Sequence, residues 1–288
     1  MVSTSTIIGI VITLFVTLIL PFIVAILFLI FGRGKGVWKG LLLGAAGFIL
    51  LQLVIRIPIL NVLSSFSWFV QFAKDYFILY SLLLALTAAL FEVIARFGVA
   101  KILQKKMNYQ MALAAGFGHG GIEAVILIGL SYINNLVYSL MINTGAMQET
   151  ISPLASQEAT AASARQLELL VQTILETPSY AFYLAGYERI LTVVCHTAMS
   201  LLVCYFVYKK KDFIGVALAF SVHFVLDFAV PLLNALSTEY LGNVVSQGVA
   251  YLLAYGLLSV ITTGAIICIW RIIKKWKAEI PEKNPEKI

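Results

Sequence analysis

The stretch "GFGHGGIEAVILIGL", Gly116–Leu130, places a histidine and a glutamate inside a long apolar run. Gly116 and Gly120 are four residues apart and therefore share one face of a helix, and small residues on one face let two membrane helices approach closely. His119 and Glu123 have the same spacing and also share a face. The stretch predicts a closely packed membrane helix that carries polar side chains into the bilayer.

The rest of the chain has the composition of a membrane protein. Of its 288 residues, 61% are hydrophobic and 12% are charged, whereas a soluble domain has about 25% charged residues. Seven apolar segments are long enough to cross a bilayer; they are 5–31, 38–63, 76–96, 109–141, 178–207, 213–235 and 243–271. The expected fold is an all-α bundle of about seven transmembrane helices, which forms a single domain over residues 1–275.

The distribution of basic residues predicts the topology and the localisation. Sixteen of the twenty Lys and Arg residues lie in one set of connections, and only Lys74 and Arg165 lie in the opposite set. The positive-inside rule then places the N-terminus outside and the C-terminus in the cytoplasm of a multi-pass membrane protein. The net charge of +6 belongs to this cytoplasmic face, so the lipid bilayer and not nucleic acid is the expected partner.

Two segments outside the spans differ from the bundle. The outer connection 142–177 has hydrophobic residues at helical spacing and a proline directly after it, which predicts an amphipathic helix on the membrane surface or over the bundle, with a plain solvated connector as the alternative. The hydrophobic residues are Leu167, Leu170, Val171, Ile174 and Leu175. Residues 276–288 are expected to form a disordered cytoplasmic tail.

Ionisable residues inside the spans are the candidates for function, because a charge at mid-bilayer is costly. His119, His196 and His223 each lie about eleven residues from the cytoplasmic end of a helix, which corresponds to a depth of roughly 16 Å. Glu123 and Asp227 each follow one of these histidines by four residues and share its helix face. Three imidazoles and two acids at one level predict a buried site.

Two chemistries suit such a site. Imidazoles and carboxylates bind catalytic zinc, with a glutamate as general base. In a metal-free version, a desolvated glutamate takes a proton from water while the histidines hold the water or an oxyanion. A proton- or metal-ion-coupled transporter and a bis-histidine haem protein remain alternatives that use the same cluster.

Other charges in the spans are assigned supporting roles. Glu92 and Arg96 are one turn apart and are expected to form a structural ion pair near the cytoplasmic end of their helix. Arg189 follows Glu188 directly and can neutralise Glu188, Asp227 or both. Arg56 precedes Pro58 by two residues and is expected to extend toward the membrane surface.

Several enzyme classes lack their motifs in this sequence. It contains no HExxH for a zincin, no GxSxG for a serine hydrolase and no P-loop. Asp227 is the one aspartate within the predicted spans, so a two-aspartate site within one chain is not available.

Three motifs on consecutive spans resemble the YhfC family of intramembrane proteases. They are "GFGHGGIEA", "YERILTVVCH" (Tyr187–His196) and "HFVLD" (His223–Asp227). The resemblance covers nearly the whole chain and keeps the order of the motifs, and the GHGGxEA element is its most specific part. The family is similar to a wider group that contains CAAX prenyl proteases, bacteriocin-processing membrane proteases and PrsW.

This resemblance implies roles for individual residues. Glu123 matches the water-activating glutamate, His196 the second-motif histidine, and His223 and Asp227 the third motif. The sequence departs from the wider group at the first motif, where paired glutamates followed by Arg or Lys are replaced by the His-x-x-x-Glu pair, so Glu188 is the alternative base.

The resemblance also implies the reaction and its partners. The expected protein is an intramembrane peptidase of a bacterial plasma membrane that cleaves membrane-embedded or membrane-proximal peptides. Glu123 activates water, Asp227 orients His223, and Glu188 and Arg189 support the site. Zn²⁺ bound by the three histidines, or no metal in a glutamate-type enzyme, are both compatible with the family, and the oligomeric state is not determined by the sequence.

Overall fold

The computed structural model describes residues 1–156 and 160–279, and these residues form helices joined by turns, with no strand among them. Seven helices in this part of the chain are long and apolar enough to cross a membrane; they are Thr4–Phe31, Val37–Ser64, Phe77–Lys106, Tyr109–Thr144, Ser179–Tyr208, Asp212–Ala235 and Gln247–Ala278. The expected all-α bundle of about seven spans is confirmed. The side of the membrane on which each terminus lies stays a prediction.

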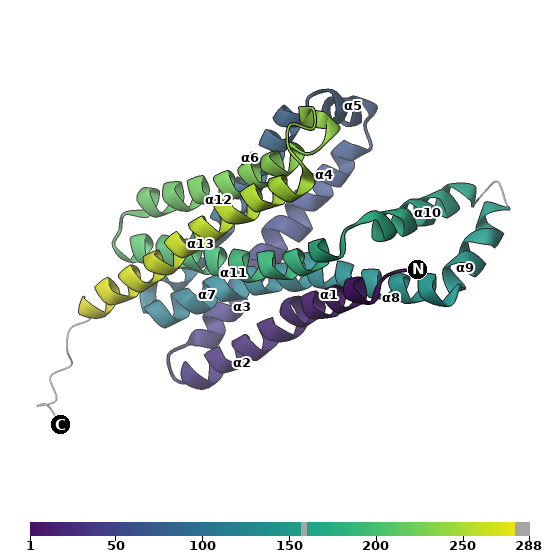
Figure 1. The fold of residues 1–288 in the computed structure, drawn as a ribbon. Coiled ribbons are helices and arrows are strands. Elements are labelled where there is room, and N and C mark those ends of the chain that lie inside the picture. Colours follow the sequence, from purple (N-terminus) through teal and green to yellow (C-terminus); the bar gives the residue numbers. More distant parts are fainter. Residues whose placement is uncertain (157–159, 280–288) are drawn as a thin grey trace, which may run out of the picture. The chain divides into compact units, whose positions relative to one another are not determined.

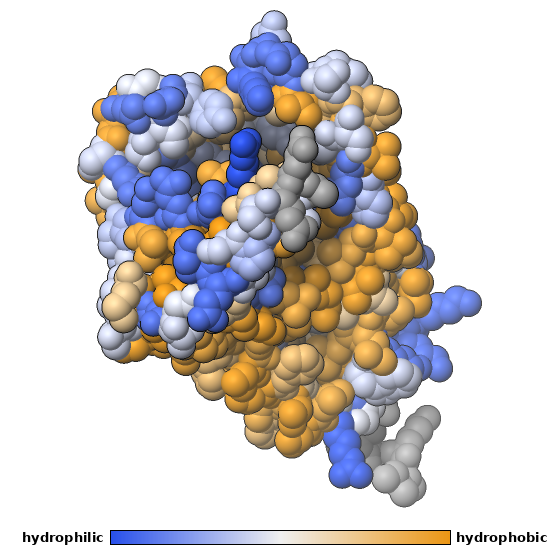
Figure 2. Space-filling view, turned by 90° about the vertical axis from the view of Figure 1, so that its right-hand side faces the viewer, coloured by the Kyte–Doolittle hydropathy of each residue, from blue (hydrophilic) through white to orange (hydrophobic). Residues whose placement is uncertain are grey.

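The surface of these helices is suited to lipid. Figure 2 shows hydrophobic side chains over much of the face in view. Phe22, Ile30 and Leu42 are 58%, 59% and 62% exposed, and a soluble protein rarely leaves large apolar areas in contact with water.

The third span is longer than the sequence predicts. The prediction ends this span at Arg96, but α6 (Phe77–Leu103) continues for about two further turns, and the short turn η3 (Gln104–Lys106) follows it. Arg96 is 2% exposed and forms an ion pair with Glu92. Because this pair compensates the charge inside the protein, Arg96 does not have to lie at the membrane surface.

Three of the spans contain a π-helical segment, a wider turn that is frequent at functional sites. The segments are η1 (Phe15–Ile19), η2 (Ile49–Arg56) and η4 (Ala124–Gly129). Two of them contain or adjoin polar side chains within the spans. Gln52 and Arg56 lie within η2, and η4 begins directly after Glu123.

The helices form two compact units, and three helices continue along the chain from one unit into the other. The first unit is Met1–Val24 with Glu123–Ile190, and the second is Ala25–Ile122 with Leu191–Ile288. The continuing helices are α2 (Leu20–Phe31), α7 (Tyr109–Glu123) and α11 (Ser179–Tyr208).

In the first unit, α1 packs against α8, and Thr13 Oγ1 donates a hydrogen bond of 2.6 Å to the carbonyl oxygen of Phe182. The other helices of this unit are α1 (Thr4–Leu14), α8 (Leu130–Thr144), α9 (Ala146–Ala155) and α10 (Ala161–Glu176). The predicted amphipathic helix is present as α10, which ends before Pro178. Ala164 and Ile174 are buried, while Leu169 on another face is 63% exposed.

In the second unit, α12 packs along both α6 and α13 (Figure 1). Leu201, Val203 and Trp276 lie in the largest apolar core of the described residues. The remaining helices of this unit are α3 (Val37–Phe48), α4 (Ile57–Ser64), α5 (Ser67–Asp75), α12 (Asp212–Ala235), η5 (Glu239–Leu241) and α13 (Gln247–Ala278). The helix α13 thus continues into the tail predicted at 276–288, of which residues 280–288 lie outside the described part.

The predicted small-residue face of α7 packs against α11. A Cβ atom at Gly116 would lie 2.6 Å from the Cα of Thr197, and one at Gly120 would lie 2.8 Å from the Cβ of His196. Neither position can accept a side chain unless the helices move apart. The two glycines therefore set the distance at which His119 and His196 face each other.

We expect Gly116→Ala to destabilise the protein, because the added methyl group would overlap the backbone of α11. Overpacking of this kind costs about 1–3 kcal/mol, so the midpoint of thermal unfolding in detergent should fall by several degrees. Gly98→Ala on α6 is the matched control, since a Cβ there meets nothing within 4 Å. Equal midpoints for the two variants would contradict the close approach of α7 and α11.

Candidate metal centre

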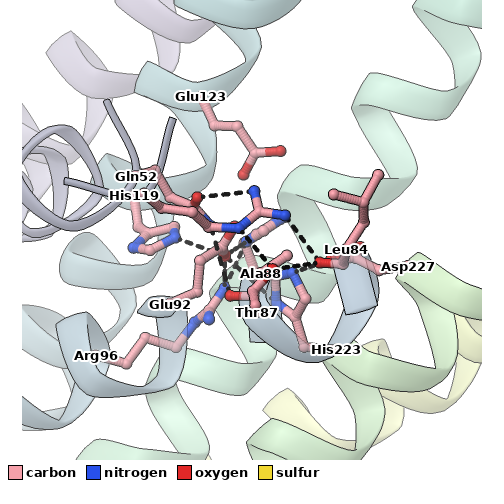
Figure 3. A network of polar contacts seen from close by, with 12 residues as sticks. Gln52, Leu84, Thr87, Ala88, Glu92, Arg96, His119, Glu123, His223 and Asp227 are labelled. Carbon is pink, nitrogen blue, oxygen red and sulfur yellow. Dashed lines mark hydrogen bonds and ion pairs between the residues drawn. The ribbon is translucent and has the colours of Figure 1, made fainter. Parts of the chain in front are cut away.

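Four nitrogen atoms surround one carboxylate oxygen inside the second unit (Figure 3). Oε2 of Glu92 lies 2.9 Å from Arg96 Nη2, 3.0 Å from His119 Nε2, 3.3 Å from His223 Nδ1 and 3.5 Å from His196 Nδ1. None of these five side chains is more than 7% exposed. A charged carboxylate is costly in such a place, and here the guanidinium of Arg96 and Nε2 of His119 can donate to it.

Four helices supply this cluster. Glu92 and Arg96 lie on α6, His119 on α7, His196 on α11 and His223 on α12. Glu92 and the three histidines are each about eleven residues from one end of their helix, which corresponds to a common depth of roughly 16 Å. The structure brings together the three histidines that the sequence predicts at one level, and it adds Glu92 at that level.

The contact with Asp227 orients His223. Oδ2 of Asp227 lies 3.0 Å from Nε2 of His223, and an ionised carboxylate can only accept a hydrogen bond. A neutral His223 therefore has its proton on Nε2 and a lone pair on Nδ1. This Nδ1 is buried and has no hydrogen-bond partner among the described residues. Metal-binding imidazoles are commonly held by a carboxylate in this way.

The contact with Arg96 orients His196. Nη2 of Arg96 lies 2.6 Å from Nδ1 of His196, and because arginine can only donate, this Nδ1 is the acceptor. The ring of His196 stacks on that of His119 with centroids 5.4 Å apart. The lone pair of His196 Nδ1 therefore accepts from Arg96, whereas Nδ1 of His223 faces Glu92 with its lone pair available to a cation.

The donor set of this cluster fits zinc. Imidazole nitrogens and carboxylate oxygens are its usual ligands. The distances from Glu92 Oε2 to the three ring nitrogens are 3.0, 3.3 and 3.5 Å. Possible ligand atoms of Glu92, His119 and His196 also lie within 4.8 Å of one another.

Two residues of η2 hold the other oxygen of Glu92. Gln52 is 3% exposed and donates from Nε2 to Glu92 Oε1 at 2.9 Å. Arg56 donates from Nη1 to the side-chain oxygen of Gln52 at 3.2 Å, and from Nη2 and Nε to Leu84 O and Thr87 Oγ1 on α6 at 2.8 and 3.2 Å. Since arginine cannot accept, Arg56 fixes the amide of Gln52 with its nitrogen toward Glu92.

The remaining predicted site residues form a group within the first unit. Arg189 Nη1 lies 3.3 Å from Glu123 Oε1, and Arg189 Nη2 forms an ion pair with Glu188. Glu123 is the last residue of α7, one turn beyond His119. The structure thus brings Glu123, Glu188 and Arg189 together, while their roles in chemistry stay predictions.

The central part of this site differs from the expectation. The pair Glu92–Arg96, expected to be structural, lies among the three histidines. The expectation that Arg56 extends toward the membrane surface is wrong, because all three guanidinium nitrogens bond within the protein. The available signal was spacing. Glu92 and Arg96, like Gln52 and Arg56, are polar residues four apart in an apolar span, as are His119 and Glu123.

We expect Gln52 and His119 to be energetically coupled through Glu92, since each contacts a different oxygen of that carboxylate. In a buffer with a metal chelator, Gln52→Leu and His119→Ala should each lower the thermal midpoint by a few degrees. Their effects should be non-additive in the wild-type background and additive in the Glu92→Gln background. Asn61→Leu replaces an exposed amide on the same span. Its effect on the thermal midpoint should be additive with that of His119→Ala. Additive losses with Glu92 present would contradict the coupling.

Comparison with known proteins identifies relatives of this chain. Residues 17–250 match the family described as YhfC intramembrane metalloprotease. The chain is also 33% identical over 127 residues to the uncharacterized membrane protein YhfC of Bacillus subtilis (strain 168). That alignment covers 44% of this chain and 46% of the relative, so the chain spans about half the length of the curated relative it matches. No solved structure matches.

The family match, the seven spans and the bacterial relative together confirm a multi-pass membrane protein with the plasma membrane as its location. Because the match covers most of the chain, the protein belongs to the YhfC intramembrane metalloprotease family.

Proposed function

We propose that the protein is a zinc-dependent intramembrane peptidase. The observation that carries this proposal is the convergence of three imidazoles from three membrane-spanning helices on the carboxylate of Glu92. A charged side chain inside a bilayer is costly and usually belongs to a functional site, so we infer that this buried cluster is one. The family name supports the peptidase activity.

The residues divide into metal ligands and a general base. A catalytic zinc keeps an open position and takes three protein ligands, and His119, His196 and His223 would fill that role. When bound there, zinc would act as a Lewis acid and increase the acidity of water. Glu92 remains as a carboxylate in contact with every imidazole, so it can take the proton from the attacking water and pass it to the leaving amine.

Arg96 is suited to stabilise negative charge during the reaction. Its Nη2 contacts Glu92 and His196, while its Nε and Nη1 are buried without a hydrogen-bond partner among the described residues. Fixed donors in a dry site are worth more than donors in water. We infer that these two nitrogens donate to the carbonyl oxygen of the scissile peptide as it becomes an oxyanion.

The depth of the site supports a substrate within the membrane. Glu92 and the histidines lie deep in helices that cross the membrane, so we propose that the substrate is a membrane-embedded or membrane-proximal peptide. A bis-histidine haem is less suited to this geometry, since its axial ligands must approach from opposite faces of a ring, whereas here the nitrogens converge on one oxygen.

The proposal is tested by zinc content and peptide cleavage of the purified protein. We expect about one zinc per chain and its loss in His196→Ala. Glu92→Gln should retain zinc and lower kcat by about 100-fold or more, as is typical for removal of a general base. Glu149→Gln, an exposed glutamate on α9, is the matched control and should cleave normally.

Other results of these experiments would support a different base, a different mechanism or a different function. A large loss in Glu123→Gln with normal activity of Glu92→Gln would move the base to the residue that the family resemblance implies. Cleavage that is unaffected by chelators would replace the metalloenzyme by a glutamate-type mechanism. Ion flux in proteoliposomes without cleavage of a membrane-peptide library would indicate a transporter.

A further inference from the structure

One cavity of the second unit is lined by none of the histidines. It has a volume of about 330 Å³ and lies among the last turns of α11, the first turns of α12 and the second half of α13. Its walls include Leu202, Phe206, Leu218 and Ile267. The cavity is therefore apolar along its length, and its volume is within the range of small ligand sites.

The floor of this cavity contains a glycine with space above it. Gly264 on α13 lines the cavity, and a Cβ atom built at this position would meet nothing within 4 Å. Gly116 and Gly120 on α7, by contrast, are in close contact with a neighbouring helix. Since no described atom lies within 4 Å of that position, the small size of Gly264 leaves open space on this side of α13.

The rim of the cavity is positively charged. Arg271 and Lys275 lie one turn apart on α13, both are exposed, and both line the cavity. Glu279 is near this end because it accepts a hydrogen bond from the hydroxyl of Tyr205, another lining residue. Lys209 Nζ lies 3.1 Å from Glu279 and balances its charge, so the rim keeps its two positive charges for an external anion.

The hydrogen bond with Glu279 raises the pKa of Lys209, which keeps that lysine charged at neutral pH. The acid near the rim is therefore compensated by a residue outside the cavity and does not oppose an anion bound between Arg271 and Lys275.

We propose that this cavity binds one anionic phospholipid, with an acyl chain along the apolar walls and the headgroup phosphate between Arg271 and Lys275. Basic pockets between membrane helices on the cytoplasmic side are suited to anionic headgroups, and the distribution of Lys and Arg predicts that this end of α13 is cytoplasmic. A free phosphate would contact Arg271 and Lys275 but not the apolar walls, and an uncharged lipid would contact the apolar walls but not these two charges. The site does not depend on the proposed peptidase activity.

The test uses thermal unfolding of the full-length protein in detergent with added phosphatidylglycerol, phosphatidylcholine or inorganic phosphate. We expect phosphatidylglycerol to raise the midpoint by several degrees more than either other addition, because a ligand that binds the folded state stabilises it. The double variant Arg271→Gln with Lys275→Gln should weaken the apparent affinity for phosphatidylglycerol at least tenfold. The pair Arg33→Gln with Lys35→Gln removes two exposed charges elsewhere and should not.

A second variant tests the acyl-chain part of the site. Gly264→Leu should fill this part of the cavity and abolish the preference for phosphatidylglycerol, since a Cβ there meets nothing within 4 Å. Gly256→Leu is the control, because it lies on the same helix, also has open space at its Cβ position and does not line the cavity. Unchanged affinity in both the Gly264 and the double charge variant would overturn the proposal. Equal stabilisation by inorganic phosphate would also overturn it, by reducing the site to an anion site.

Discussion

A carboxylate inside a membrane-spanning bundle costs several kcal/mol unless donors and positive charge surround it. Glu92 meets this requirement through Gln52 at one oxygen and through Arg96 and His119 at the other, where His196 and His223 also lie within 3.5 Å. Since these donors come from different helices, each helix must bring its donor to the same depth. The contacts of one carboxylate therefore constrain the register of five helical segments.

The backbone is adapted to this constraint at two places. Gly116 and Gly120 let α7 approach α11 closely enough for the imidazoles of His119 and His196 to stack. The π-helical segment η2 carries Gln52 and Arg56, and the two side chains bond to each other and to α6. Close packing and a widened turn thus both bring polar side chains to Glu92.

The same compensation that stabilises Glu92 prepares the site for chemistry. The imidazole of His223, whose Nε2 is held by Asp227, keeps a lone pair on Nδ1 that can accept a cation without a large rearrangement. Membership of a metalloprotease family is consistent with this arrangement. A centre that is rigid before substrate arrives is what electrostatic catalysis requires, because the donors do not have to reorganise during the reaction.

Sequence patterns predicted the spans and the level of the histidines well, but they misjudged the third span. The prediction assumed that Arg96 marks a membrane boundary, and this assumption placed Glu92 near the surface. In the structure α6 continues to Leu103, so Glu92 lies at the depth of the histidines. A charge ends an apolar span only when no partner compensates it, and sequence spacing alone does not reveal the partners on other helices.

Hydropathy and helical periodicity are local properties, so the sequence by itself determined the seven spans, the amphipathic helix α10 and the shared face of His223 and Asp227. The choice of Glu92 as the acid that contacts the histidines was decided only by the tertiary structure. That choice depends on how far each helix is rotated about its own axis, and this rotation is set by packing between helices that are distant in sequence. The contact between Gln52 and Glu92, forty residues apart, is the clearest example.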